Sequence, residues 1–231
     1  DWKTYAQQDK LGHAFVSWHL ARVFGEFALW SGMNRKRAGL FGGAASALFQ
    51  SQIELFDGFS AAYGASRTDI LANLIGGAAG GAKVAFPEEL SWITSKYSYH
   101  PSPYYDEGAS SLAPLRYLGN VLKDYDGISY WLVIRPSELD LPISWPAWLG
   151  ASVGYSATGL AHPLSGRTES GDSGGPVHRR QIFLSPDIDV FASGGSWPQP
   201  FRAIAGILSF VRFPSPALQV TPEVRWYWIY Y

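Results

Sequence analysis

Acidic, basic and amide side chains recur at helical spacing in the first third of the chain. They are Asp9, Lys10, His13, Gln50, Glu54, Asp57, Asp69 and Asn73. At about 100° per residue, the members of each local group lie on one helix face. Carboxylates beside a histidine can hold a divalent cation or transfer protons, which makes His13, Glu54 and Asp69 candidate catalytic residues.

The same residues also have a structural interpretation, which we favour. An aspartate at position 9 or 69 stabilises the N-terminus of a helix by its charge. Lys10, His13 and Glu54 can form a buried network of ion pairs and hydrogen bonds that fixes the register of packed helices. On this interpretation we expect no metal and no cofactor.

A second motif is the hexapeptide Gly171-Asp-Ser-Gly-Gly-Pro176, which is identical to the nucleophile motif of trypsin-like serine proteases. That family consists of two β-barrels, whereas the first third of this chain has the pattern of helices. His162 lies only 11 residues before Ser173, and His13 and His19 lie inside a predicted helix. We therefore interpret the match at Ser173 as coincidental, because a motif counts only in its structural context.

Proline divides the chain into two parts. All 15 prolines lie from residue 87 onward. We predict that residues 1–86 form a bundle of three helices, at about 8–30, 37–56 and 67–86. Ser66 with Asp69 resembles a capping box at the third helix, with Asp in place of the usual Glu. In an up-down-up bundle the polar ends of all three helices meet, which brings His13, Glu54 and Asp69 together.

Residues 87–231 are rich in proline and aromatic side chains, and their pattern predicts short strands. We expect strands at 128–134, 148–156, 181–190 and 218–230, and short helices at 112–122 and 201–210. The predicted fold class is therefore α+β: an N-terminal three-helix cluster packed with a small antiparallel sheet and additional short helices. We expect the two parts to pack as one unit.

Composition excludes several functions. The 18 basic and 19 acidic residues give a net charge of −1, which argues against nucleic-acid binding. There is no cysteine, so disulfides and thiolate chemistry are excluded within these 231 residues. None of the three predicted helices is a clean membrane span, because each carries charged or amide side chains. The 10 tryptophans suit a protein core and, for part of the C-terminal cluster, a membrane interface.

The helical motifs resemble a known family. Asp9-Lys10-x-x-His13, Glu54-x-x-Asp57-Gly58 and Asp69-x-x-x-Asn73-x-x-Gly76 look like the YfiM-type predicted bacterial lipoproteins of unknown function, and are loosely similar to VanZ-like membrane proteins. Four later segments resemble the longer, Bacteroidetes-type members of the family. They are Asp126-Gly-Ile-Ser-Tyr-Trp-Leu132, Pro146-Ala-Trp-Leu-Gly-Ala-Ser-Val-Gly-Tyr155, Leu184-Ser-Pro-Asp-Ile-Asp189 and Phe213-Pro-Ser-Pro-Ala-Leu218.

The resemblance implies an exported envelope protein at the outer membrane or in the periplasm, and it implies no known reaction. We therefore predict a non-enzymatic protein, structural or accessory to an outer-membrane assembly. Its expected partner is an outer-membrane protein or the membrane surface. The alternative function is a hydrolase that uses the carboxylate and histidine residues at the end of the helical bundle.

Overall fold

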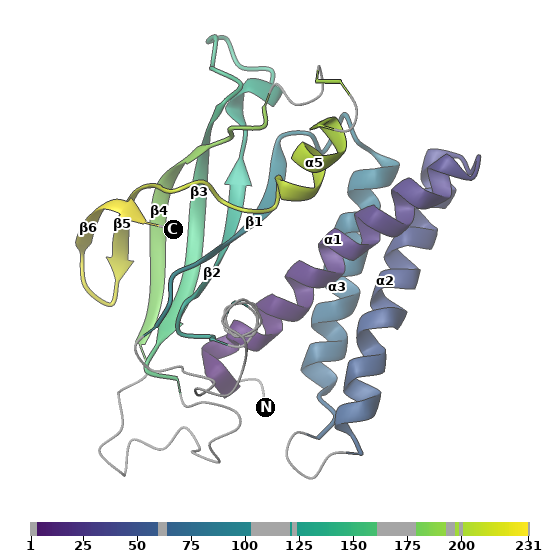
Figure 1. The fold of residues 1–231 in the computed structure, drawn as a ribbon, viewed down its shortest axis with the longest axis horizontal. Helices are drawn as coiled ribbons and strands as arrows, with labels where there is room; N and C mark the ends of the chain where they lie inside the picture. Colours follow the sequence, from purple (N-terminus) through teal and green to yellow (C-terminus); the bar gives the residue numbers. More distant parts are fainter. Residues whose placement is uncertain are drawn as a thin grey trace. The chain divides into compact units, whose positions relative to one another are not determined.

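The computed structural model describes residues 4–59, 64–102, 121, 124–160, 179–192, 197–198 and 201–230. They form two compact units, Asp1–Ser91 and Trp92–Tyr231, which we call the helical unit and the sheet unit. The first contains three helices and the second a six-stranded antiparallel sheet (Figure 1). The prediction of an α+β fold, with three helices followed by an antiparallel sheet, is confirmed.

The helical unit begins with the short 3-10 helix Thr4–Gln7. The helices α1 (Gln8–Trp30), α2 (Arg35–Asp57) and α3 (Arg67–Ala85) follow, running up, down and up in Figure 1. Side chains cap two of these helices. Asn34 accepts a hydrogen bond from the Arg37 backbone at α2, and Ser66 accepts one from the Asp69 backbone at α3. Polar caps satisfy amides that have no partner within the helix.

Glycines let the three helices approach each other closely. On α3, Gly76 and Gly80 face α1, where a Cβ atom would clash with the carbonyl oxygens of Ala14 and Trp18. One residue further on, Gly77 and Gly81 face α2, and their backbones contact Gly43 and Gly39 in the same way. Small residues therefore make the contacts between helices that Leu and Phe make in an ordinary bundle.

The sheet unit is a meander in which each strand pairs with the next along the chain. Its strands are β1 (Ile93–Tyr99), β2 (Ile128–Ile134), β3 (Leu149–Thr158), β4 (Arg179–Ile188), β5 (Ser215–Thr221) and β6 (Arg225–Tyr230). A short 3-10 helix, Pro136–Glu138, follows β2, and the helix α5 (Phe201–Leu208) precedes β5. Residues 210–212 run beside β1, through hydrogen bonds with Tyr97.

One prediction about strands is wrong, and one further strand has no counterpart in the sequence analysis. The expected single strand at 218–230 is a hairpin, β5 and β6, because Pro222 cannot donate a ladder hydrogen bond and lies at the turn. The strand β1 was not predicted from the sequence, because its alternate buried residues are Thr94, Lys96 and Ser98 and give no apolar alternation. The sheet consequently has six strands where four were expected. The expected helix at 112–122 lies, except for residue 121, outside the described residues.

A small aromatic cluster fills the apolar part of the sheet unit. Trp131, Val133, Phe183 and Ala217 are buried together, and Tyr227 and Tyr230 pack against them. Ser98 accepts a hydrogen bond of 2.9 Å from the Trp131 indole. Elsewhere the buried face of the sheet carries serines, a lysine and an aspartate.

Candidate functional site

The ammonium group of Lys10 lies between two carboxylates at the start of α1. Its Nζ is 2.9 Å from Asp69 Oδ1 and 3.2 Å from Asp9 Oδ2. Burial opposes the charge on Lys10, but the hydrogen bond to Asp69 and the charges of Asp9 and Asp69 outweigh it, so the pKa of Lys10 is raised. The side chains of Lys10 and Asp69 are 7% and 5% exposed, which makes this pair nearly dry.

The imidazole ring of His13 bridges α2 and α3. Its Nδ1 donates to Asn73 Oδ1 at 3.1 Å, and its Nε2 lies 3.3 Å from Glu54 Oε1 and 3.8 Å from Asp9 Oδ1. Because every one of these neighbours is an oxygen atom, both ring nitrogens face acceptors. The ring of His13 thus connects Glu54 on α2 with Asn73 on α3.

Glu54 at the end of α2 also caps α3. Its Oε2 accepts a 2.9 Å hydrogen bond from the backbone amide of Ser66, while the Ser66 hydroxyl accepts one from Asp69. The predicted capping box is therefore only half correct. The Asp69 side chain pairs with Lys10 and does not return to the Ser66 amide, and Glu54 from another helix takes that role.

Of the remaining predicted residues, Asn73 lies in this network. Asn73 is fully buried, and its Oδ1 accepts a hydrogen bond from Ser17, which the sequence analysis did not identify. Asn73 Nδ2 has no hydrogen-bond partner in the described part of the chain. Gln50 is buried one turn before Glu54. The side chain of Asp57 lies outside the described residues, as do Ser173 and its hexapeptide.

Oxygen and nitrogen atoms of this cluster could also hold a metal ion. Asp9, His13 and Asp69 each offer one ligand atom, and these atoms lie within 4.8 Å of one another. The ammonium of Lys10, however, contacts both aspartates from within the cluster. The ammonium of Lys10 thus already occupies the position between these carboxylates, and the residues fit a metal poorly.

A second buried polar cluster, in the sheet unit, was not found by the sequence analysis. Lys96 on β1 pairs with Asp187 on β4 at 2.6 Å, with side chains 2% and 1% exposed. Arg212 lies 3.8 Å above the Trp131 ring and donates to the hydroxyls of Ser185 and Ser215. Burial lowers the pKa of Arg212 to about 10, although Asp187 opposes the shift. The sequence signal that could have revealed this cluster is a charged residue, such as Asp187, at a strand position where the side chain points inward.

A comparison with known protein families gives a match in the helical unit, which contains the network of Lys10 and His13. Residues 3–84 match the family model "Predicted periplasmic lipoprotein (DUF2279)". The helical part is therefore similar to a family of predicted periplasmic lipoproteins, and the match ends before the sheet unit begins. No curated protein and no solved structure matches the chain. No described helix has both the length and the hydropathy needed to cross a membrane.

Proposed function

We propose that the protein is a non-enzymatic component of the bacterial cell envelope, in which the helical unit is a scaffold fixed by its buried polar network. One observation carries this proposal: each candidate catalytic group already has a structural partner. Asp69 pairs with Lys10, and Glu54 pairs with His13 and caps α3. A network of this kind selects one register of the three helices, because any shift leaves a buried charge unpaired.

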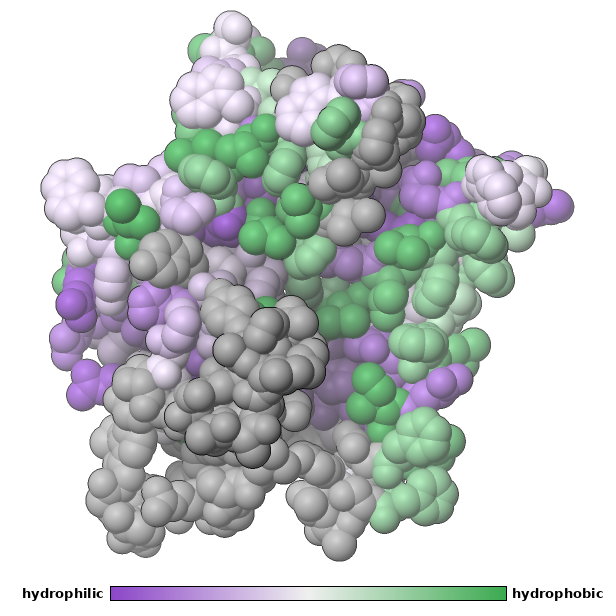
Figure 2. Space-filling model, viewed as in Figure 1, coloured by the Kyte–Doolittle hydropathy of each residue, from purple (hydrophilic) through white to green (hydrophobic). Residues whose placement is uncertain are grey.

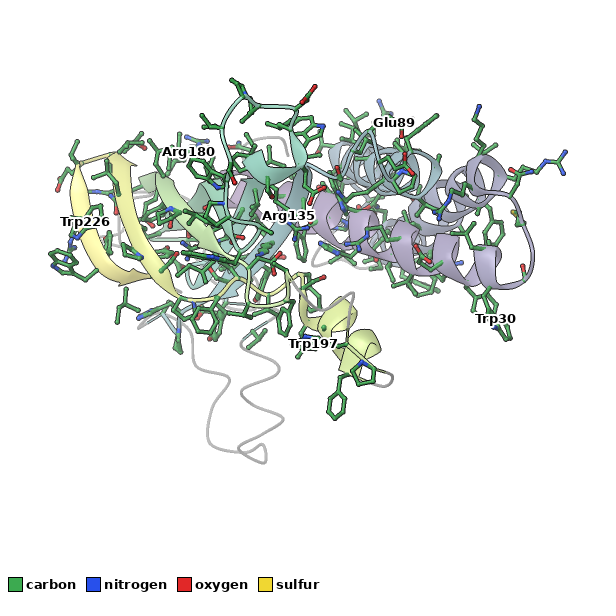
Figure 3. The ribbon with its side chains drawn as sticks, turned by 90° about the horizontal axis from the view of Figure 1, so that it is seen from above. Trp30, Glu89, Arg135, Arg180, Trp197 and Trp226 are labelled. Atoms are coloured by element: carbon green, nitrogen blue, oxygen red, sulfur yellow. The ribbon has the colours of Figure 1, made fainter. Side chains whose placement is uncertain are left out.

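We further propose that the protein has an accessory role at the outer membrane. The open edge of the sheet is the feature that supports an accessory role. The strand β6 is an edge strand, and no described strand pairs with its outer side. Trp228 and Ile229 on this strand are exposed, and Figure 3 shows Trp226 at the outer edge of the sheet. An open, aromatic edge strand is a site at which another protein can add a strand.

A hydrolase remains the second candidate, and one observation favours it. His13 is 14% exposed, whereas Glu54 behind it is 4% exposed. A partly exposed histidine beside a buried carboxylate is an arrangement that general bases use. The two functions predict opposite effects of one substitution.

Glu54→Gln tests them. If the network is structural, removing this charge from a buried pair costs about 3–5 kcal/mol, which lowers the melting temperature by roughly 10 °C or more. If the residues form a catalytic site, stability is unchanged or rises while the cellular function is lost. Glu26→Gln is the matched control, because Glu26 is an exposed glutamate on α1 with no described ion pair.

Cell fractionation tests the location separately. We expect the native protein with the outer membrane or in the periplasm. A wholly cytosolic protein would exclude the accessory role, whatever the result at Glu54.

A further inference from the structure

The outer surface of the helical unit is apolar on all three helices. Exposed large side chains include Phe27 and Trp30 on α1, Leu40 and Leu48 on α2, and Leu74 and Ile75 on α3. Trp30 is 81% exposed and Leu40 is 77% exposed. In Figure 2 green, apolar side chains follow the visible side of these helices. Soluble proteins seldom expose continuous apolar surfaces of this extent.

The interior of the same unit, in contrast, contains small and polar residues. Its helices meet through Gly76, Gly80 and their neighbours, and its buried side chains include Ser17, Ser46 and Asn73. The large apolar residues are thus not needed to hold the helices together. Those nearest the end where α1 finishes and α2 begins are Phe27 and Trp30 on α1 and Leu40 on α2.

Basic residues cluster at the end of the unit where α1 finishes and α2 begins. Arg35, Lys36 and Arg37 are consecutive and exposed, and the first turn of α2 holds no acidic residue. None of the three forms an ion pair with a described residue. The helix dipole disfavours cations at an N-terminus, so their placement costs stability and needs another explanation.

The aromatic and apolar side chains lie next to this basic cluster. Trp30 precedes it by one short turn, and its ring lies 5.5 Å from the ring of Phe27. Leu40 and Phe41 follow Lys36 and Arg37 by four residues, hence on the same helix faces. Proteins bound to a membrane place residue types in a fixed order. Cations lie at the lipid headgroups, aromatic rings at the interface, and aliphatic side chains among the acyl chains.

Acidic residues also lie near this end, and Glu26 is exposed on α1, one turn before Trp30. Glu88 and Glu89 follow α3, and Figure 3 shows Glu89 and Trp30 pointing to different sides of the helical unit. The net charge of the whole chain is only −1, so long-range repulsion from an anionic surface is weak.

We propose that the end of the helical unit formed by Trp30 and Arg35–Arg37 binds the surface of an anionic phospholipid membrane, with the apolar side chains behind it entering the acyl region. The binding is interfacial and concerns this surface alone, so it does not depend on the role of Glu54.

Vesicle sedimentation with the full 231-residue chain tests this proposal. We expect binding to vesicles that contain phosphatidylglycerol, weak binding to phosphatidylcholine alone, and a decrease as salt is added. The triple variant Arg35→Gln/Lys36→Gln/Arg37→Gln should bind on the order of a hundredfold less, because each cation at an anionic surface contributes about a factor of five. Its melting temperature should not fall, since the variant removes cations from a helix N-terminus.

The control removes the same charge elsewhere, with Arg67→Gln/Arg179→Gln/Arg225→Gln, all exposed. It should bind anionic vesicles nearly as well as the native chain. Trp30→Ser should weaken binding, and Trp228→Ser, at a residue 78% exposed in the sheet unit, should not. Equal losses in the variants and their controls, equal binding to both lipids, or no binding by the native chain would each overturn the proposal.

Discussion

Each unit buries one lysine–aspartate pair, and the two pairs differ in their surroundings. Lys10–Asp69 in the helical unit has further carboxylates beside it, from Asp9 and, through His13, from Glu54. Lys96–Asp187 in the sheet unit has a further cation beside it, Arg212, whose pKa Asp187 raises against the effect of burial. One cluster is rich in acids and the other is rich in bases.

The surplus charge is balanced by different means in the two units. In the helical unit Lys10 contacts two carboxylates, and the ring of His13 lies beside Asp9 and Glu54 at the partly exposed edge of the network. In the sheet unit the extra cation is compensated by the Trp131 ring, two serine hydroxyls and the carbonyl oxygen of Tyr230. The acidic cluster is therefore bridged by a ring at its partly exposed edge, whereas the basic cluster is enclosed by an aromatic ring and hydroxyl groups.

The largest expected effect is at the drier pair. Lys96→Met leaves Asp187 buried without its ammonium partner and should lower the free energy of unfolding by about 3–5 kcal/mol. Urea unfolding measures the loss, and hydrogen exchange should localise it to β1 and β4.

The double variant Lys96→Met/Asp187→Leu is its control. Replacing both charges with apolar side chains should restore part of the stability, because Asp187 is no longer buried without its partner, while Arg212 keeps the Trp131 ring and two serine hydroxyls. A double variant as unstable as Lys96→Met would show that the pair is not the source of the loss.

The next largest difference between the two units is the expected effect of a glycine-to-alanine substitution on stability. Gly76→Ala places a methyl group against the Ala14 carbonyl of α1, and overpacking of this kind costs about 1–3 kcal/mol. Gly206→Ala in α5 meets no atom within 4 Å and should stabilise its helix by up to about 1 kcal/mol. Thermal unfolding of both variants checks the two signs. Equal effects would mean that α1 and α3 are not as close as described.

A substitution of Arg212, the extra cation of the basic cluster, should have a smaller effect on stability. Arg212→Lys keeps the charge but loses the planar group that stacks on Trp131 and donates to Tyr230 O at 2.8 Å. We expect a loss of about 1–2 kcal/mol in urea unfolding. Arg225→Lys, whose guanidinium lies 5.1 Å from the Tyr227 ring on an exposed strand, should change stability by less than about 0.5 kcal/mol. Comparable losses at both positions would remove the special role of Arg212.

The sequence was informative where one helix face repeats a single kind of residue. Proline distribution and helical spacing located α1, α2 and α3 to within two residues at each end, and placed His13, Glu54 and Asp69 at one end of the bundle. Alternation failed in the sheet, because Lys96 and Asp187 occupy buried strand positions that the apolar pattern assigns to hydrophobic residues. Lys96 and Asp187 are 91 residues apart in the sequence, and only the strand order brings them together.

The partner assignments within the helical network were equally beyond the sequence. Ser66 and Asp69 are spaced as a capping box, yet Lys10 competes for the Asp69 carboxylate and Glu54 takes the vacant amide. Local spacing describes which groups can pair, whereas the distances between helices decide which of them do.

The smallest expected effect concerns the pH dependence of the acidic network. The pKa of Lys10 is raised, so its ion pairs contribute fully below the pKa of an unfolded lysine, and that contribution is lost as pH rises through the folded pKa. Lys10→Arg keeps a charge that does not titrate in this range. The decline of unfolding free energy above about pH 10 should therefore be shallower than in the native chain. Tyr155 and Tyr230, whose pKa values burial raises, add the same decline to both proteins and cancel in the comparison. Lys36→Arg, at an exposed position, is the control and should follow the native curve. Urea midpoints measured from neutral to alkaline pH give the slopes, and identical slopes for Lys10→Arg and the native chain would mean that the acidic cluster does not hold its lysine more tightly than water does.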